Sequence, residues 1–429
     1  MKKKQDFYKQ LRSAPNYLMP AWWQVYDNGL TSKSAEINDE VKQAKKEITK
    51  VLSKIQRELR EDRFIFDHSK GILIKAPGKK KPRPIVIPSL RSRIVQRAIL
   101  DVLQGAPQIQ KYLAFPFSFG GVRRPEGYQE SKLRGVPEAI EAAARAIKNG
   151  SNYYIRSDIK SFFSNISQEK VLQILQRDLK DQKFIELIRN ALMVQLKNED
   201  DLREVLNLFP SKEKGVAQGS CLSPLMGNIL LYEFDQMMNT DAVVCIRYID
   251  DLLILAKNKT LAEKAFNKGR KHLKELGLDL HEKFDDADKA AKGNVASGID
   301  FLGVRLHSGS IFPSKKARSK IKNEIKELFQ ESRLKNFRSS SLADSRDYTL
   351  VNTLKLAHNK LKGWGNQYSF CNNKNAFKDM DDALTEEIAE YFNSYYAQLR
   401  SLNEQEKRKI LGVHLLIDSK YDPILWEEL

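Results

Sequence analysis

A chain of 429 residues that is 41% hydrophobic and 30% charged has enough apolar material for two or three packed lobes, which excludes a disordered protein. Lys and Arg exceed Asp and Glu by 73 − 55 = 18, and this excess favours nucleic acid as a partner, because phosphate groups attract clustered Lys and Arg. Three widely spaced cysteines exclude a disulfide framework or a CxxC metal site, and no stretch reaches the roughly 20 apolar residues of a membrane span, so we expect a cytoplasmic protein without a membrane partner.

The first third of the chain changes from a helical to a hairpin pattern. Residues 1–60 predict an N-terminal extension, in which apolar residues recur at steps of three and four between positions 41 and 55, the period of a helix. Residues 61–90 carry short apolar runs broken by Gly and Pro, which is typical of a β-hairpin. The link between the last two runs, 75–82, contains four lysines and predicts an exposed basic tip suited to phosphate groups.

The rest of the chain alternates helices and strands before it becomes helical. We expect helices at about 91–104, 136–148, 260–276 and from 223, and strands at 153–159, 243–249, 252–256 and 300–306. After about residue 312 the strand pattern fades and a lysine-rich helical pattern begins. These changes predict three parts: the extension 1–60, a central region 61–311, and a helical region 312–429.

Carboxylates stand at the ends of predicted strands. Asp158 ends one apolar strand and Asp250-Asp251 separates two others, so neighbouring strands of one sheet would bring the acids to one edge. Phosphoryl transfer from a nucleoside triphosphate uses two metal ions about 3.5–4 Å apart, and magnesium prefers such oxygen ligands. An Asp in a turn is ordinary turn chemistry, but two adjacent charges between apolar strands are costly unless they bind something.

The Tyr248-Ile-Asp-Asp251 segment resembles the Tyr-x-Asp-Asp box of reverse transcriptases, and further motifs of that family follow in the family order. They are Lys81–Pro88 with Arg93–Gln96 (fingers), Ser118–Gly120 with Arg124-Pro125 (template contact), Asp158–Phe163 (first carboxylate motif), Gln218–Pro224 (the Gln-Gly-x-x-x-Ser-Pro box), and Gly277–Leu280, Lys283 and Phe301–Gly303 (last palm motifs). Leu361–Tyr368 resembles the Gly-Trp-x-x-Tyr phrase in the thumb of group II intron reverse transcriptases. The chain thus resembles the bacterial group II intron-like lineage.

This resemblance implies an α+β right-hand polymerase, with fingers and a palm of antiparallel sheet plus helices in 61–311 and an all-helical, maturase-like thumb with a C-terminal extension in 312–429. It implies an RNA-directed DNA polymerase that uses two Mg²⁺ ions and dNTP substrates, with an RNA template and a DNA product as partners.

The resemblance also implies roles for single residues. Asp158, Asp250 and Asp251 would be catalytic and hold the metals, with Ile159 as a further metal ligand. Five residues would bind the nucleotide: Lys75 and Arg83 at the triphosphate, Phe163 as the bulky group that excludes a 2′-hydroxyl, Gln218 as a lining residue, and Lys283 as a proton donor to the leaving pyrophosphate. Arg123, Arg124, Lys315 and Lys316 would bind nucleic acid. Plain alternatives are a core role for Phe163 and a solvated surface role for Arg83 and Lys283.

Three biological roles fit these motifs. Six scattered histidines show no HNH or zinc spacing, so an intron-type endonuclease is not expected, and the chain resembles stand-alone defence-associated reverse transcriptases that act with a dedicated non-coding RNA. An intron maturase, which assists RNA splicing, is the second reading. A protein-primed or template-independent DNA polymerase is the third, with Tyr391, Tyr395 and Tyr396 as conceivable primers or, alternatively, as one buried helix face.

Overall fold

The computed structural model describes residues 6–75, 82–121, 135–211, 213–282, 284, 289–338, 348–411, 413 and 416. The chain divides into two compact units, Met1–Val295 and Ala296–Leu429. This division comes before the boundary predicted at 311/312, because a three-stranded sheet within 299–313 falls in the second unit. Among the described residues, no helix combines the length and the apolar character that crossing a membrane requires.

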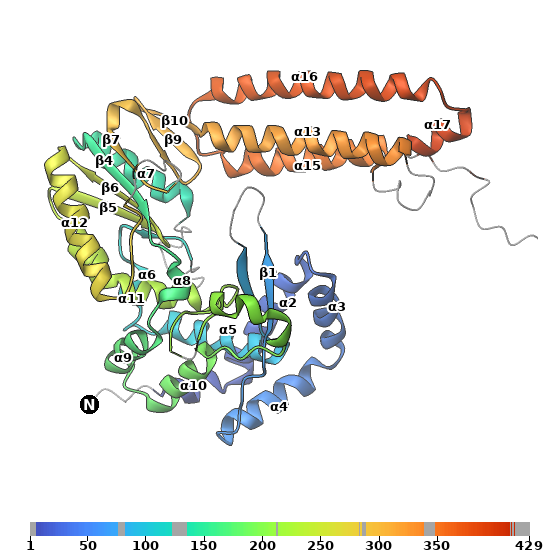
Figure 1. The fold of residues 1–429 in the computed structure, drawn as a ribbon. Coiled ribbons are helices and arrows are strands. Elements are labelled where there is room, and N and C mark those ends of the chain that lie inside the picture. Colours follow the sequence, from blue (N-terminus) through green and yellow to red (C-terminus); the bar gives the residue numbers. More distant parts are fainter. Residues whose placement is uncertain are drawn as a thin grey trace, which may run out of the picture. The chain divides into compact units, whose positions relative to one another are not determined.

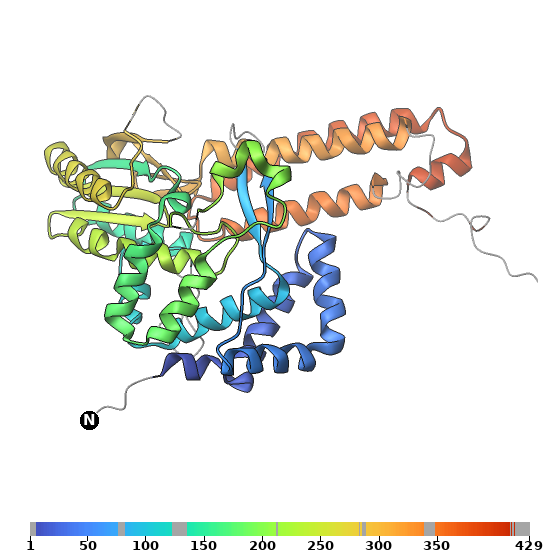
Figure 2. The same cartoon turned by 60° about the horizontal axis from the view of Figure 1, so that its bottom comes forward.

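The N-terminal extension is helical. Its elements are α1 (Phe7–Leu11), η1 (Ala14–Leu18), α2 (Met19–Leu30), α3 (Ala35–Ala44), η2 (Lys45–Glu47) and α4 (Ile48–Arg60), so the helix expected across 41–55 is interrupted by η2. The Ser34 side chain caps α3 by accepting a hydrogen bond from the Ile37 amide. Trp22 and Val41 are fully buried, and α2 packs against α5 (Leu90–Gly105), which places the blue helices beside the cyan helix in Figure 2.

The expected hairpin follows the extension. Strand β1 (Lys70–Ile74) pairs antiparallel with β2 (Arg83–Ile87), with Ile72 opposite Ile85. The apolar run at 64–66 forms no strand. Phe64 is instead buried in the main core, where it also makes an edge-on contact with Phe66, so tertiary packing and not a ladder explains this run.

The largest sheet of the first unit has five strands (Figure 1). Its order is β3-β5-β6-β4-β7, with β3 (Ser118–Phe119), β4 (Tyr153–Asp158), β5 (Val243–Tyr248), β6 (Asp251–Ala256) and β7 (Ala291–Asn294). The sheet is antiparallel except for β3, which runs parallel to β5. The expected antiparallel palm sheet is therefore mixed at one edge.

Helices cover both faces of this sheet. All residues from Leu252 to Ala256 are buried although successive side chains point to opposite faces, so neither face is open along β6. Helices α11 (Ser223–Met238) and α12 (Lys259–Glu275) pack against each other and against β5, while α7 (Val136–Lys148) packs against β3, β5 and β6. The remaining helices of the unit are α6 (Gln110–Leu113), α8 (Phe162–Asn165), α9 (Gln168–Leu179), α10 (Gln182–Leu192) and η3 (Asp200–Leu208).

The second unit begins with the antiparallel sheet β10-β9-β8, formed by β8 (Ile299–Phe301), β9 (Val304–His307) and β10 (Ser310–Pro313). Helices α13 (Lys315–Arg338), α15 (Leu350–Gln367), α16 (Lys374–Leu399) and α17 (Glu404–Ile410) follow. Phe329 stacks on Tyr391 with ring centroids 4.4 Å apart, and both belong to the core of this helical bundle. The regular secondary structure described after 313 is thus helical, as the sequence predicts for the thumb.

Candidate active site

The pairing of β4 with β6 brings the predicted carboxylates together. Asp158 lies opposite Asp251 at the end of the ladder, and one residue further on the Ile159 amide donates a hydrogen bond to the Asp250 carbonyl at 2.9 Å. Asp158 and Asp251 point to the same face of the sheet, because directly opposed residues of an antiparallel pair share a face. The expected convergence of the three acids at one edge is therefore present.

The turn that carries two of these acids has a strained backbone. Ile249 has φ +59°, a left-handed conformation that β-branched residues rarely adopt and that costs about 1–3 kcal/mol. Gly120 lies against this turn, since a Cβ added there would come 2.9 Å from the Ile249 side chain. Glycine is required at this position, because its own φ is +80° and a side chain would displace the turn.

Burial and mutual repulsion disfavour the ionised form of the acidic pair. Burial raises the pKa of Asp250, and Asp158 nearby adds to this rise while Arg83 and Lys289 oppose it. Burial, followed by the charges of Asp250 and Asp158, raises the pKa of Asp251 to about 6. A site of this kind gains most from a bound cation, which removes the repulsion that raises these pKa values.

The two carboxylate oxygens of Asp158 differ in their contacts. Its Oδ2 accepts a hydrogen bond from Lys289 Nζ at 3.0 Å, and its Oδ1 lies 3.8 Å from His281 Nε2. This Oδ1 is buried and has no hydrogen-bond partner among the described residues. An orphaned carboxylate oxygen beside two further acids fits a hard cation such as Mg²⁺.

The carboxylates do not form a complete protein cage. Within the described ranges, no three His, Cys, Asp or Glu side chains are arranged to hold a metal by themselves. Magnesium in nucleotide sites is bound through one or two carboxylates, with substrate phosphates and waters completing its octahedral shell. The donor set therefore fits metal ions that arrive with a triphosphate, with Asp158, Asp250 and Asp251 as the side chains that would hold them.

The Gln218-Gly219 segment is hydrogen-bonded to the hairpin strand β2. The Val86 amide donates a hydrogen bond to the Gln218 carbonyl at 2.9 Å. Gly219 has φ +112°, and a Cβ there would lie 2.9 Å from the Val86 carbonyl oxygen, so a close backbone approach explains this glycine. The exposed Arg83 is the first residue of β2, so the hydrogen bond between Val86 and Gln218 connects its strand to the palm.

Phe162 and Phe163 lie in different environments. Phe162 is 3% exposed and packs against Gly227, where an added Cβ would come 2.8 Å from its ring. Phe163 is half-buried, and its carbonyl accepts a hydrogen bond from the Val216 amide at 2.7 Å. Phe162 is thus the core residue of the pair, and Phe163 keeps accessible surface, as a group that touches a substrate would need.

The remaining predicted site residues are either exposed or lie outside the described residues. Lys75 is exposed just after β1, and Lys315 and Lys316 are exposed in the first turn of α13 in the second unit. Lys283, Arg123 and Arg124 lie outside the described residues. Lys289 is the described lysine that contacts Asp158, and the sequence motifs did not single it out.

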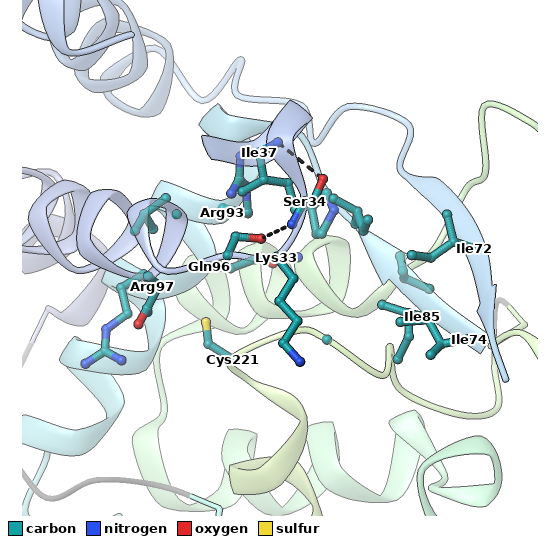
Figure 3. Close-up of a pocket in the computed structure, with 18 residues that line it drawn as sticks. Lys33, Ser34, Ile37, Ile72, Ile74, Ile85, Arg93, Gln96, Arg97 and Cys221 are labelled. Carbon is teal, nitrogen blue, oxygen red and sulfur yellow. Dashed lines mark hydrogen bonds between the residues drawn. The ribbon is translucent and has the colours of Figure 1, made fainter. Parts of the chain in front are cut away.

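A cavity of about 430 Å³ lies between the N-terminal helices, the hairpin and α5, and it reaches Gly219 (Figure 3). Ile37, Ile72 and Ile85 are apolar lining residues, while Lys33 and two arginines of α5 supply positive charge. The arginines, Arg93 and Arg97, pair with Glu40 and Asp101, yet the Nε groups of both are buried without a hydrogen-bond partner in the described part of the chain. Sequence reasoning missed this cavity, because the extension carries no recognisable motif.

Arg247 is a second residue that the motifs did not single out. Its side chain is 1% exposed near the end of the apolar strand β5 and forms an ion pair with Asp235 of α11. A charged residue inside an apolar run is the pattern that points to it, because a buried charge requires partners.

Comparison with known proteins identifies related sequences. Residues 73–306, more than half of the chain, match the family model described as reverse transcriptase (RNA-dependent DNA polymerase). An uncharacterized 91 kDa protein in the cob intron of Schizosaccharomyces pombe is 34% identical over 189 residues, which cover 44% of this chain and 21% of that protein. Protein YkfC of Escherichia coli is 26% identical over 259 residues, covering 53% of this chain and 63% of that protein.

The group II intron-encoded protein LtrA of Lactococcus lactis is 25% identical over 225 residues, covering 52% of this chain and 34% of that protein. The chain therefore spans between a fifth and two thirds of the length of these relatives. Among solved structures, apo telomerase from Candida tropicalis aligns with a TM-score of 0.42 at 15% identity, covering 76% of this chain and 63% of that chain. A partial Cas6-RT-Cas1–Cas2 complex aligns with a TM-score of 0.36 at 20% identity, covering 63% and 43%.

Proposed function

The chain belongs to the reverse transcriptase (RNA-dependent DNA polymerase) family, and on this premise we propose that it extends a primer with deoxynucleotides on an RNA template, using two Mg²⁺ ions. The observation that carries the proposal is the position of Asp158 opposite Asp251, with Asp250 beside them, at one edge of the sheet. The raised pKa values of Asp250 and Asp251 at this cluster support a role in binding cations.

In this proposal each part of the site has a chemical task. When bound, the metal ions supply an activated 3′-hydroxyl and neutralise the triphosphate. Asp158, Asp250 and Asp251 hold them, with Ile159 as a further ligand. Arg83 contacts the triphosphate from the hairpin, since a guanidinium forms paired hydrogen bonds to phosphate oxygens, and Lys75 adds a second positive charge there.

Substrate selection and proton transfer complete the proposed nucleotide site. Phe163 excludes a 2′-hydroxyl by occupying the space next to the sugar, and Gln218 lines the base and sugar from the palm. Lys283 gives a proton to the leaving pyrophosphate, and Arg123, Arg124, Lys315 and Lys316 bind the backbones of template and primer.

The cavity beside Gly219 supports a path for the template. Its isoleucines offer apolar contact to a base, and Lys33 offers positive charge to a phosphate, the two parts of an unpaired nucleotide. Since Gly219 adjoins Gln218, an unpaired template nucleotide in this cavity would lie next to the position of the incoming dNTP.

Primer extension tests the proposed activity. A DNA primer on an RNA template, with Mg²⁺ and dNTPs, is expected to be extended by the wild type and at least about a thousandfold more slowly by Asp250→Asn. Asp200→Asn is the matched control, because Asp200 has an 87% exposed side chain on η3 in the same unit. Equal extension by the wild type and Asp250→Asn would contradict the metal-binding assignment.

We place this activity in bacterial anti-phage defence, in the cytoplasm, with an associated non-coding RNA as template. The proposal is supported by the histidine content, which lacks the spacing of an HNH endonuclease. RNA that copurifies with the protein should be one structured species encoded beside the gene, and Asp250→Asn should abolish protection in a plaque assay. Protection that is unchanged in this variant would contradict a role for DNA synthesis in defence.

Two alternatives have specific support. Similarity to proteins named for introns favours a maturase, which a splicing assay on the intron RNA flanking the gene would test. For protein priming, Tyr391 and Tyr395 are 1% exposed and their hydroxyls are hydrogen-bonded, whereas Tyr396 is 62% exposed. Tyr396 is therefore the accessible candidate of the three, and DNA covalently attached to it would support priming by the protein.

A further inference from the structure

Arg247 connects the strand before the acidic pair to three surrounding elements. It belongs to β5 and directly precedes Tyr248, and its side chain is buried. Its five N–H groups are matched by five hydrogen bonds: Nε to Asp235 Oδ1 at 2.7 Å, Nη2 to Asp235 Oδ2 at 2.5 Å and to Ser118 Oγ at 2.6 Å, and Nη1 to Asn228 Oδ1 at 3.1 Å and to the Ile249 carbonyl at 3.0 Å.

A lysine could not reproduce this arrangement. The guanidinium presents five donors in one plane, and Asp235 takes two of them in a paired, side-on geometry. An ammonium group has three donors and no fixed plane, so it would keep the charge opposite Asp235 but leave part of the acceptor set without a donor. The arrangement therefore depends on the shape of arginine as well as on its charge.

One of the five bonds reaches the strained turn itself. The Ile249 carbonyl belongs to the peptide that leads into Asp250, and Ile249 is the residue with φ +59°. A strained conformation persists only where its surroundings fix it. On the other side of the turn the Ile249 side chain lies against Gly120, where an added Cβ would come within 2.9 Å of it, so both the side chain and the carbonyl of this residue have defined neighbours.

The partners of Arg247 come from elements that carry the other motifs. Ser118 lies on β3 in the template-contact motif, while Asn228 and Asp235 lie on α11, which begins at Ser223 of the Gln-Gly box. A guanidinium that is bonded to both elements and to the turn fixes the acidic pair relative to the nucleotide and template segments.

We propose that Arg247 is a positioning residue for the metal site, which fixes the Ile249 carbonyl and thereby aims Asp250 and Asp251 at the metal ions. It does not touch metal or substrate, and it acts through the backbone of the turn. The inference rests on the proposed polymerase function.

The test compares Arg247→Lys with Asn239→Ala. Asn239 also joins β5 to α11, since its side chain bonds the Cys245 amide and carbonyl and the Asp235 carbonyl, but its contacts lie further from the acidic pair. Loss of this link is therefore a matched structural perturbation. We expect Arg247→Lys to lower kcat about 10- to 100-fold and to raise the Mg²⁺ concentration for half-maximal activity several-fold, with the dNTP KM changed less than kcat. Asn239→Ala should lower Tm about as much as Arg247→Lys does, but it should leave the metal requirement and kcat near the wild-type values.

A binding measurement without turnover gives a second readout. Mn²⁺ binding, followed by electron paramagnetic resonance with a dideoxy-terminated primer and dNTP present, should weaken several-fold in Arg247→Lys and stay unchanged in Asn239→Ala. Asn228→Ala removes one acceptor on the Nη1 group that also bonds Ile249, and it should shift the metal requirement in the same direction by a smaller factor. This milder variant decides the question if Arg247→Lys does not fold.

The outcomes separate this inference from the proposed function. A wild type without polymerase activity would contradict the function. The positioning role would be overturned if the wild type is active but Asn228→Ala, and Arg247→Lys where it folds, show the same metal requirement and Mn²⁺ affinity as Asn239→Ala. Arg247 would then be a structural residue only.

Discussion

Asp158 lies directly opposite Asp251 at the end of the β4–β6 ladder, so two carboxylates from segments almost a hundred residues apart share one face of the sheet. The antiparallel register fixes this relation, because a slip by one residue would turn one of the acids to the opposite face. Asp250 lies in the turn before β6, and its backbone carbonyl accepts a hydrogen bond from the Ile159 amide. The proximity of these charges has consequences for stability as well as for catalysis.

Replacing Asp251 should stabilise the metal-free protein at neutral pH. The pKa of Asp251 is raised from an ordinary 3.8 to about 6, so the folded state holds this proton more tightly than the unfolded state does. Stability therefore falls as the pH rises between these two values, and the loss is complete above about pH 6. Asp251→Asn removes this loss, which we expect to be on the order of 1–3 kcal/mol at pH 7.5.

Thermal unfolding in EDTA at several pH values measures this effect. The Tm difference between Asp251→Asn and the wild type should be positive at pH 7.5 and should shrink towards pH 4. Excess Mg²⁺ with dNTP should stabilise the wild type and leave the variant almost unaffected. A variant that is less stable than the metal-free wild type at pH 7.5 would contradict the electrostatic account of the site.

Gly219 should be required for tight nucleotide binding for steric reasons. In Gly219→Ala the new Cβ would lie 2.9 Å from the Val86 carbonyl, which would separate β2 and Arg83 from Gln218. We expect the dNTP KM to rise about tenfold or more, because the triphosphate contacts and the palm would no longer be aligned. Gly150→Ala is the control, since Gly150 also has positive φ, +98°, but no described atom lies within 4 Å of an added Cβ. Steady-state kinetics measure the dNTP KM of both variants. Equal KM values would contradict the steric role of Gly219.

The order of the elements and the acidic cluster could be predicted from the sequence, since apolar periodicity and local motifs determine both. Strand 153–158 and helices 136–148 and 223–238 lie where the pattern places them. The interruption of the first long helix at η2 and the absence of a strand at 64–66 could not be predicted, because tertiary packing overrides local propensity there.

The support of the site was harder to predict than its acids. Arg247 and Asp235 are twelve residues apart on different elements, and nothing in their local sequence indicates that they pair. The positive φ of Ile249 also contradicts the preference of a β-branched residue, so no propensity argument would predict it. Long-range packing creates both features.

Phe163 should control the choice between deoxynucleotides and ribonucleotides. Phe163→Ala would open space at a half-buried position that packs against the edge of the core, so we expect the preference for dNTP over rNTP to fall at least about tenfold, with a smaller loss of stability than at a fully buried position. Phe162→Ala is the contrasting variant, because Phe162 is 3% exposed and its loss should cost about 3–5 kcal/mol. Single-nucleotide incorporation of dNTP and rNTP by Phe163→Ala measures the ratio. An unchanged ratio would assign Phe163 to the core instead.

Lys33 should contribute to binding of unpaired template. Its side chain extends into the cavity beside Gly219 (Figure 3), where a phosphate of a single-stranded overhang would meet it. We expect Lys33→Ala to weaken binding of a primer-template with a 5′ template overhang about two- to fivefold and to reduce the salt dependence by about one charge, because one phosphate contact is lost. A blunt-ended duplex should bind Lys33→Ala and the wild type equally. Lys50→Ala is the control, since the Lys50 side chain is 81% exposed on α4 and does not line the cavity. Fluorescence anisotropy over a salt series measures these affinities. Equal losses of affinity for blunt and overhanging substrates would show that Lys33 attracts nucleic acid in general and does not contact an unpaired template nucleotide.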